Sequence, residues 1–411
     1  MNSMLIIGAG EAGVRAALKL RELNSSVPIT IIEMEKGDPY ERPPLSKSSL
    51  TAELFEPKNI VTKAQLTEQH IQFIDGVLVE SIDAQAKQVT LSNHKKLMFD
   101  KLLIATGASA RTLPFANASE EDLEHFVFTL RTASDCQRIR SKVLAGQKVV
   151  LIGAGFIGLE LAASLQAQQI KVTVLETQPR ILQRAVPEAV ARILHQAHHQ
   201  NGTEIKLNSS IENVTFDHQA RITLSSGEHL DADWLVVGIG SIPNINIAQQ
   251  AELEIDNGIK VNIQMQTSHK DIYAAGDVCS FPYTVTQQRV RLESWRCAQE
   301  QAEVAAQNML GGRKVYDLAP WFWSDQYNLG LQMVGLPLGA THSVTRLLGE
   351  SSCLHFEAHS DGHLLSACGV GVGNQIAKDI KLAERLINQR KTVSIEELAD
   401  PYVKLKDLLK K

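Results

Sequence analysis

Residues 4–33 read MLIIGAGEAGVRAALKLRELNSSVPITIIE: an apolar strand, a glycine-rich turn, an Ala- and Leu-rich helix, a second apolar strand and an acidic residue. Residues 149–176, VVLIGAGFIGLELAASLQAQQIKVTVLE, repeat the same plan. Continuous apolar strands that alternate with helices are typical of a parallel sheet covered on both faces. The two copies therefore predict an α/β fold with two Rossmann-like dinucleotide-binding domains.

Each copy contains the spacing G-x-G-x-x-G directly after its first strand. The first glycine of such a motif makes a tight turn, the second lets the backbone approach a pyrophosphate, and the third lets the helix pack on the strand. The amino terminus of the helix adds N–H groups and a positive dipole end. One match is weak evidence, but both copies also have the strand, the helix and the acid. The predicted nucleotide-binding residues are Gly8, Gly10, Gly13, Gly153, Gly155, Ile157 and Gly158.

The acid that ends the second strand can accept hydrogen bonds from ribose hydroxyls. Glu176 is the single candidate in the second copy. In the first copy both Glu33 and Glu35 are candidates, and the sequence does not separate them. Arg180 and Arg184 follow Glu176 at a distance, with no arginine next to it to bind a 2′-phosphate. We therefore expect NADH to be preferred to NADPH, unless Arg180 or Arg184 folds back.

Composition excludes several classes of protein. The 411 residues are 44% hydrophobic and 21% charged, with a formal net charge of -5, which gives no reason to expect nucleic-acid or membrane binding. The five cysteines form no C-x-x-C pair, which argues against a zinc ribbon or a redox dithiol. His195 and His199 could bind a metal at i, i+4, but no third ligand is evident, so no metal is predicted. The apolar run at the amino terminus is too short for a signal peptide, and we expect a cytoplasmic protein.

The chain length predicts more than one domain. We expect a discontinuous first dinucleotide-binding domain at 1–112 and 243–318, a second dinucleotide-binding domain at 113–242, and a C-terminal α+β domain at 319–411. In the last of these, PWFWSDQY at 320–327 is interpreted as an aromatic loop, and a charged helix is expected at about 374–390.

The segment YERPPLSK at 40–47 is unusual, because two adjacent prolines stiffen the backbone between Arg42 and Lys47. Together with IATGA, GAGFIGLELA, VGIGSIPN, YAAGDV, ESW and PWFWSDQY, in this order, it resembles the NADH-dependent ferredoxin reductases of oxygenase systems. The resemblance covers nearly the whole chain, and it implies a glutathione-reductase-like flavoprotein fold with FAD and NAD as cofactors. It also implies that residues 1–112 and 243–318 form the FAD-binding domain and residues 113–242 the NAD-binding domain.

The resemblance also implies roles for residues outside the glycine motifs. Lys47 would lie beside the flavin and pair with Glu160, expected in the first turn after the second motif; these two are the candidate catalytic residues. The other implied contacts are with the cofactors, from Arg42, Pro43, Thr106, Gly107, Asp277, Val278, Trp295, Glu293, Gly240 and Arg184.

The implied activity is transfer of a hydride from NADH to FAD and of single electrons to a [2Fe–2S] ferredoxin, which would feed an aromatic-ring dioxygenase or a P450 in hydrocarbon catabolism. The alternatives are a reductase for rubredoxin, a quinone or monodehydroascorbate, and a redox-signalling flavoprotein. Disulfide reductases of the same superfamily carry cysteines beside the flavin, whereas the 42–44 run here has none.

A basic face around Trp295 is a further hypothesis, since ferredoxins of this kind are usually acidic. Arg289, Arg291 and Arg296 are close to it in sequence and could receive the ferredoxin. Alternatively, these arginines pair with nearby acids, namely Glu293, Glu300 and Glu303.

Overall fold

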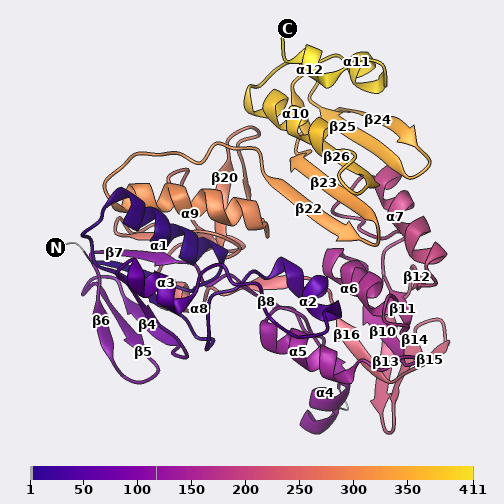
Figure 1. Ribbon diagram of the computed structural model, residues 1–411, viewed down its shortest axis with the longest axis horizontal. Coiled ribbons are helices and arrows are strands. Elements are labelled where there is room, and N and C mark those ends of the chain that lie inside the picture. The colour runs from indigo at the N-terminus through magenta and orange to yellow at the C-terminus, as the bar shows by residue number, and fades with distance from the viewer. Residues whose placement is uncertain (1–2, 117, 411) are drawn as a thin grey trace. The chain divides into compact units, whose positions relative to one another are not determined.

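A computed structural model of the chain describes residues 3–116 and 118–410 (Figure 1). They form two compact units. Unit 1 contains the residues up to Glu41, Lys58–Ser109 and Ile242–Trp321; unit 2 contains Arg42–Pro57, Ala110–Ser241 and the residues from Phe322 onward. The chain passes from one unit to the other five times, after Glu41, Pro57, Ser109, Ser241 and Trp321. Two of these crossings lie within short strands, β8 (Ala108–Ala110) and β17 (Ser241–Pro243).

Unit 1 is built on a five-stranded parallel sheet in the order β19-β7-β1-β2-β3. The central strand is MLII, all four residues of which are buried, as expected for a strand covered on both faces. The strands are β1 (Met4–Ile7), β2 (Ile29–Ile32), β3 (Ile71–Ile74), β7 (Lys101–Ile104) and β19 (Ile272–Ala274).

Helix α1 (Glu11–Leu23) follows β1 and lies alongside α9 (Trp295–Met309), as Figure 1 shows. The buried face of α1 is made of small and apolar residues at helical spacing, which allows the two helices to approach closely. The rest of unit 1 comprises α3 (Lys63–Glu68), α8 (Asn246–Gln250), and two three-stranded sheets: β4 (Val79–Asp83), β5 (Gln88–Leu91) and β6 (Lys96–Met98); β18 (Ile259–Lys260), β20 (Cys279–Tyr283) and β21 (Gln288–Val290).

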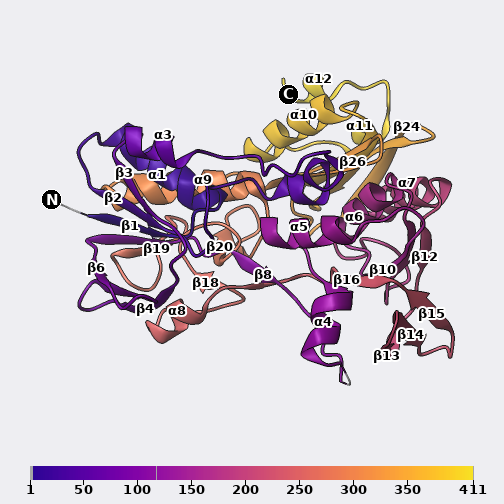
Figure 2. The same cartoon turned by 60° about the horizontal axis from the view of Figure 1, so that its bottom comes forward.

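Unit 2 repeats the plan of unit 1, with a parallel sheet in the order β12-β11-β10-β16-β9. An antiparallel three-stranded sheet packs its apolar face on β10 and β16. Figure 2 shows where these strands lie. The strands are β9 (Val127–Phe128), β10 (Lys148–Ile152), β11 (Lys171–Leu175), β12 (Glu204–Lys206) and β16 (Trp234–Val237), with β13 (Ile211–Phe216), β14 (Ala220–Leu224) and β15 (His229–Ala232) in the smaller sheet.

Helix α6 (Phe156–Gln166) follows β10 and is buried on almost every side, because its residues are apolar apart from a few positions. Short helices from the 42–57 segment contact it. The other helical elements of this part are η1 (Pro43–Ser46), α2 (Ser48–Thr51), α4 (Glu120–Phe126), α5 (Ala133–Lys142) and α7 (Glu188–Gln200).

The C-terminal part of unit 2 is a five-stranded sheet in the order β22-β23-β26-β25-β24, with α10 lying on one face (Figure 1). The interpretation of 320–327 as a loop was wrong: Trp321–Gln326 forms β22, since aromatic residues suit a half-buried pleated surface. The elements are β22 (Trp321–Gln326), β23 (Leu329–Gly335), β24 (His342–Gly349), β25 (Ser352–Ala358), β26 (Leu364–Val372), α10 (Ala377–Asn388), α11 (Ile395–Ala399) and α12 (Leu405–Leu408).

Among residues 3–116 and 118–410, no helix is long and apolar enough to cross a membrane. The predicted three-domain boundaries stay a prediction, because the compact units place residues 322–410 together with 110–241.

Candidate functional site

The predicted residues of unit 1 meet at one edge of its parallel sheet. Gly8 follows β1, Glu33 follows β2, Thr106 follows β7, and Asp277 follows β19. These four strands are neighbours and parallel, so their carboxyl ends lie together. Ligands of open α/β sheets bind outside the carboxyl ends of the strands. Unit 1 also holds Gly10, Gly13, Glu35, Gly107, Val278, Glu293 and Trp295.

The first glycine motif has the geometry of a pyrophosphate cradle. Gly8 has φ of +102°, and a Cβ there would lie 2.3 Å from the carbonyl oxygen of Ala105. A Cβ on Gly13 would lie 1.9 Å from the carbonyl oxygen of Gly8, so the helix can pack on the strand only with glycine at this position. A Cβ on Gly10 would meet nothing within 4 Å. The space beside Gly10, at the amino terminus of α1, therefore fits the pyrophosphate of a dinucleotide.

The second motif reproduces this geometry in unit 2. Gly153 has φ of +105°, a Cβ on Gly158 would lie 2.2 Å from the carbonyl oxygen of Gly153, and Gly155 is open apart from an atom at 4.0 Å. Ile157, between them, is 43% exposed although it is apolar. Gly240, beyond the end of β16, has φ of +108° and open space at its Cβ position. The carboxyl-terminal edge of the parallel sheet in unit 2 therefore fits a second dinucleotide.

Glu33 in unit 1 and Glu176 in unit 2 make the same kind of hydrogen bond. Glu33 Oε2 accepts a hydrogen bond of 2.6 Å from the backbone N–H of Ala9, and Glu176 Oε2 accepts one of 2.9 Å from that of Ala154. Glu35 differs, because its Oε2 accepts from the hydroxyl of Tyr40 at 2.7 Å. Glu33 thus occupies the position in unit 1 that Glu176 occupies in unit 2.

Two arginines, Arg180 and Arg184, follow Glu176 in the chain. Arg180 donates to the backbone carbonyls of its own loop, at Ile181, Leu182 and Gln183. Arg184 is exposed. This arrangement favours a ribose with a free 2′-hydroxyl over one with a 2′-phosphate.

Asn244 was not singled out from the sequence, although it ends the quoted segment VGIGSIPN. It binds two residues of the loop after β7: its Nδ2 donates to the Thr106 carbonyl at 2.8 Å, and its backbone N–H donates to the Gly107 carbonyl at 3.0 Å. Thr106 Oγ1 donates in return to the Asn244 carbonyl at 2.9 Å. Asn244 therefore fixes the backbone beside the first cradle.

Glu11, the residue after the second glycine of the first motif, is the second feature that sequence reasoning missed. Its Oε1 accepts a hydrogen bond of 2.6 Å from Nε2 of Gln299 on α9. Burial raises the pKa of Glu11, and this hydrogen bond opposes the effect. A carboxylate therefore lies at the amino terminus of α1, close to where the glycine geometry leaves room for a pyrophosphate.

The arginines near Trp295 are bound to acids and backbone carbonyls. Arg291 Nη1 donates to Glu293 at 2.9 Å and to the Asp277 carbonyl at 3.1 Å. Arg296 pairs with Glu300 at 2.8 Å. These contacts match the alternative interpretation for two of the three arginines; Arg289 donates to the carbonyls of Val261 and Ser280, and Glu303 pairs with Arg15. They give no support to a basic docking face.

Lys47 and Glu160 form an ion pair in unit 2, with Nζ 2.7 Å from Oε2. Glu160 is 3% exposed, and it also accepts from the hydroxyls of Ser46 and Ser324. It is the fifth residue of α6, so its expected place in the first turn was wrong. Stabilisation by the helix dipole falls off within the first turn, so the three donors are the better explanation for this buried carboxylate.

The segment before Lys47 is held by backbone contacts. Arg42 Nη1 donates to the Arg131 carbonyl at 2.7 Å, and Pro43 begins η1, where a missing N–H costs nothing. The two prolines thus bring Lys47 to the end of a short rigid turn.

His198 is the buried histidine of α7, not His195 or His199. It is fully buried, its Nε2 lies 2.9 Å from Oε1 of Gln326, and burial lowers its pKa to about 4. No group of three or more potential metal ligands occurs among residues 3–116 and 118–410.

All five cysteines lie in the described part of the chain, and all are buried and free. Burial raises the pKa of every one of these thiols, to about 11 for Cys136 and Cys353. The thiolate is the nucleophile in disulfide exchange. None of these thiols is therefore suited to that reaction.

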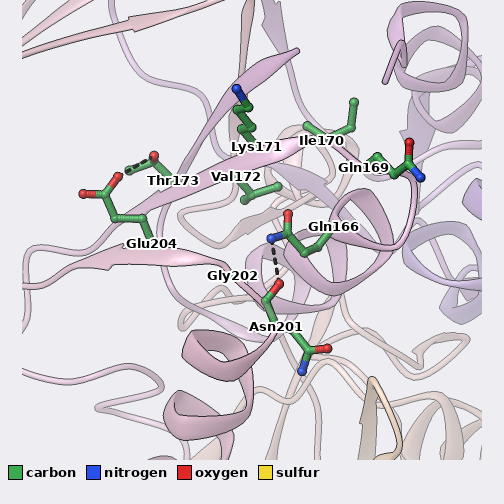
Figure 3. A pocket seen from close by; sticks show the side chains of 9 residues that line it. All are labelled: Gln166, Gln169, Ile170, Lys171, Val172, Thr173, Asn201, Gly202 and Glu204. Carbon is green, nitrogen blue, oxygen red and sulfur yellow. Dashed lines mark hydrogen bonds between the residues drawn. The ribbon is translucent and has the colours of Figure 1, made fainter. Parts of the chain in front are cut away.

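A separate hollow of about 350 Å³ lies at the other end of β11 (Figure 3). Figure 3 shows the amide of Gln166 bound to the Asn201 carbonyl, and Thr173 bound to Glu204. The hollow includes Lys171, the first residue of β11, and so lies at the amino end of the strand, away from Glu176. These two hydrogen bonds engage part of its polar lining, and we assign the hollow no function.

Comparison with known proteins agrees with this geometry. The family described as pyridine nucleotide-disulphide oxidoreductase matches residues 2–302, and the reductase C-terminal family matches residues 321–409. The chain belongs to the pyridine nucleotide-disulphide oxidoreductase family. It is 36% identical to the ferredoxin–NAD(+) reductase component of the anthranilate 1,2-dioxygenase system of Burkholderia cepacia, over 98% of each chain. It is 35% identical to rhodocoxin reductase of Rhodococcus erythropolis, over 98% of this chain and 93% of that protein.

Solved structures of family members superpose closely. Putidaredoxin reductase, crystallised as a covalent complex with putidaredoxin, has a TM-score of 0.93 at 32% identity, over 100% of this chain and 98% of that one. A ferredoxin reductase from Rhodopseudomonas palustris has a TM-score of 0.92 at 33% identity, over 99% of both chains. The predicted family resemblance, the α/β fold, the oxidoreductase class and the cofactors FAD and NAD are confirmed.

Proposed function

We propose that the protein is an NADH-dependent ferredoxin reductase, which passes electrons from NADH through FAD to a [2Fe–2S] ferredoxin and so to a terminal oxygenase. FAD, when bound, supplies the exchange between a two-electron donor and a one-electron acceptor. The observation that carries the proposal is the combination of two dinucleotide cradles with five buried thiols of raised pKa. The family also includes disulfide reductases, and their chemistry needs a reactive thiol that this chain does not present.

We assign the first cradle to FAD and the second to NADH, in the order that the resemblance implies. Gly8, Gly10 and Gly13 leave room for the FAD pyrophosphate, and Glu33 faces the ribose. Thr106, Gly107, Asp277 and Val278 lie at the ends of neighbouring strands and contact the flavin nucleotide. In unit 2, Gly153, Gly155, Ile157, Gly158, Glu176, Arg184 and Gly240 bind NADH.

Lys47 acts beside the flavin ring in this proposal, and Glu160 orients it. The ammonium group can stabilise negative charge that develops on a reduced ring, since fixed charges are most effective where water is excluded. Arg42 and Pro43 set the approach of the Lys47 turn. Trp295 and Glu293 lie toward the nicotinamide side.

The acceptor follows from the named relatives, which are reductase components of dioxygenase systems, together with rhodocoxin reductase. The cytoplasm, where thiols stay reduced, suits the five free cysteines. We also propose that residues 1–112 with 243–318, 113–242 and 319–411 are the FAD, NAD and C-terminal domains.

A steady-state NADH assay with several acceptors tests the proposal. We expect the highest kcat/KM with a [2Fe–2S] ferredoxin, a lower value with rubredoxin, slow reaction with oxygen, and no reaction with glutathione disulfide. Ferricyanide serves as the control that reports flavin reduction alone. Efficient reduction of a disulfide, or ferredoxin reduction no faster than the reaction with oxygen, would contradict the proposal.

A further inference from the structure

A continuous chain of polar side chains runs through unit 2 from Glu160 to Thr203. It joins α6, the C-terminal strand β22 and helix α7, which are far apart in the sequence. Its links are Ser324 Oγ to Glu160 Oε1 at 2.7 Å, Gln326 Nε2 to Ser324 Oγ at 3.1 Å, His198 Nε2 to Gln326 Oε1 at 2.9 Å, Tyr327 OH to His198 Nδ1 at 3.3 Å, and Thr203 Oγ1 to Tyr327 OH at 3.1 Å.

The direction of the first links follows from the chemistry of the groups. A carboxylate accepts hydrogen bonds and has none to give, so Ser324 donates its proton to Glu160. Its oxygen then accepts from the amide NH₂ of Gln326, which leaves the amide oxygen of Gln326 as an acceptor. His198 must therefore carry its proton on Nε2.

The outer links follow in the same way. Burial lowers the pKa of His198 to about 4, so the ring is neutral at physiological pH and its Nδ1 is an acceptor. Tyr327 therefore donates to Nδ1, and Thr203 donates to Tyr327. Every donor in the chain points toward Glu160, an arrangement in which the hydrogen bonds polarise one another.

The row of hydrogen-bonded side chains is buried near the Glu160 carboxylate. Ser324, Gln326 and His198 are each at most 1% exposed, whereas Tyr327 is partly exposed. Buried polar groups are costly to leave unmatched, so this inner part is locked in one arrangement. Glu160 receives Ser46 and Lys47 on Oε2 and Ser324 on Oε1, so loss of the Ser324 donor frees one oxygen and lets the carboxylate rotate.

We propose that Ser324, Gln326 and His198 are positioning residues that hold Glu160 in the rotamer that pairs with Lys47. The C-terminal sheet thereby takes part in setting the redox centre, through two residues of β22. The inference rests on the proposed function, because it assumes that Lys47 acts on the flavin.

The first test is the tautomer of His198, observed by ¹⁵N NMR of the histidine-labelled holoenzyme, with His198→Gln used to assign the signal. We expect a neutral ring protonated on Nε2 from about pH 5.5 to 8. A ring protonated on Nδ1, or one that is cationic at pH 7, would overturn the proposed direction. This readout does not depend on catalysis.

The second test is the rate of flavin reduction by NADH in anaerobic stopped flow. We expect about a fivefold loss for Ser324→Ala, because one hydrogen bond to a charged group is removed, with unchanged FAD content and NADH affinity. His198→Phe should lose a similar factor. His198→Gln, whose amide nitrogen can replace Nε2, should stay within about twofold of wild type.

His199→Gln is the matched control, an exposed histidine on the same helix. Reduction of Ser324→Ala and His198→Phe at the wild-type rate would discard the positioning role while leaving the proposed function intact. Failure of NADH to reduce the wild-type flavin would instead overturn the proposed function. The tautomer of His198 would still test the proposed direction of the hydrogen bonds.

Discussion

The two glycine-rich turns are almost the same in backbone, yet their helices differ in what they carry. In both, the first glycine has φ slightly above +100°, the second faces open space, and the third packs against the first. The residue after the second glycine is Glu11 in unit 1 and Phe156 in unit 2, where its ring packs 4.4 Å from that of Phe322. Helix α6 also carries the buried Glu160, while α1 packs on α9.

The backbone that binds a dinucleotide is thus common to both copies, whereas the residues that could select or react with a nucleotide are not. The shared backbone makes each turn a dinucleotide cradle, and it specifies nothing about which nucleotide binds or reacts. The residues that distinguish the copies lie outside the glycines, at the helix start in unit 1 and on the second turn of α6 in unit 2. Variants of the two copies can therefore test whether the first binds FAD and the second binds NADH.

The largest expected effect is on the choice of coenzyme, which Glu176 should control. A 2′-phosphate would meet its carboxylate at short range, so we expect kcat/KM to favour NADH over NADPH by about two orders of magnitude or more. Glu176→Ala should reduce this preference to within about tenfold. Glu33→Ala is the matched control, since it should weaken FAD binding and leave the preference unchanged. Equal efficiency of the wild type with both coenzymes would refute the assignment.

Alanine at the open glycine of each turn should separate the two cradles. A Cβ at Gly10 or Gly155 meets little protein, so both variants should fold with the wild-type Tm. We expect Gly10→Ala to weaken FAD binding about thirtyfold, or about 2 kcal/mol, and Gly155→Ala to raise the KM for NADH by a similar factor. FAD retention on dialysis and steady-state kinetics measure the two effects. If either variant affected both ligands equally, the separate assignments would fail.

The two turns could be predicted from the sequence because the local backbone geometry requires glycine at fixed positions within about 30 residues of chain. The choice between Glu33 and Glu35 could not, since the loops between helix and strand differ in length between the copies. The hydrogen bond from Ala9 to Glu33 and that from Tyr40 to Glu35 distinguish the two acids only in three dimensions.

The partners of Glu160 could not be predicted because Ser324 is 164 residues away in the chain. A signal for His198 did exist. Val190, Leu194 and His198 recur at i, i+4 and i+8 on α7 and share its buried face, whereas His199 falls outside that stripe. Helical periodicity would have placed His198 in the core before any metal pair was considered.

Lys47→Ala tests whether the chemistry depends on the second copy. Its removal leaves the Glu160 carboxylate buried without its cation, which is unfavourable, and takes the ammonium group away from the flavin. We expect flavin reduction by NADH to slow about twentyfold while FAD stays bound. Lys58→Ala, at an exposed lysine of unit 1, is the control. Stopped-flow reduction at the wild-type rate would remove Lys47 from the site.

His198 should give unit 2 a pH-dependent stability. Its pKa is about 4 in the folded protein and near 6.5 when unfolded, so the unfolded chain binds the extra proton between these values. Stability should therefore fall as the pH drops from about 6.5 to 4, by at most about 1.4 kcal/mol per pH unit. The free energy of unfolding, measured with urea at several pH values, should depend less on pH in His198→Gln than in His199→Gln. An identical pH dependence in the two variants would place His198 in a solvated environment.

The smallest expected effect concerns Glu11 in the first turn. Burial raises its pKa, so the folded protein keeps a proton that the unfolded chain loses as the pH rises above about 4.5. Above the folded pKa the buried carboxylate is charged, which disfavours both the folded state and a neighbouring pyrophosphate. Glu11→Gln keeps an acceptor for Gln299 and removes the charge.

We therefore expect Glu11→Gln to bind FAD about threefold more tightly than wild type at pH 8, with a smaller gain at pH 5. Fluorescence titration of the apoprotein with FAD at both pH values measures this. Glu22→Gln makes the same charge change near the far end of α1, where the carboxylate is exposed, and should have little effect. Weaker FAD binding by Glu11→Gln at pH 8 would show that the carboxylate serves the cradle directly, as Glu33 does, and the two copies would then differ less than their helices suggest.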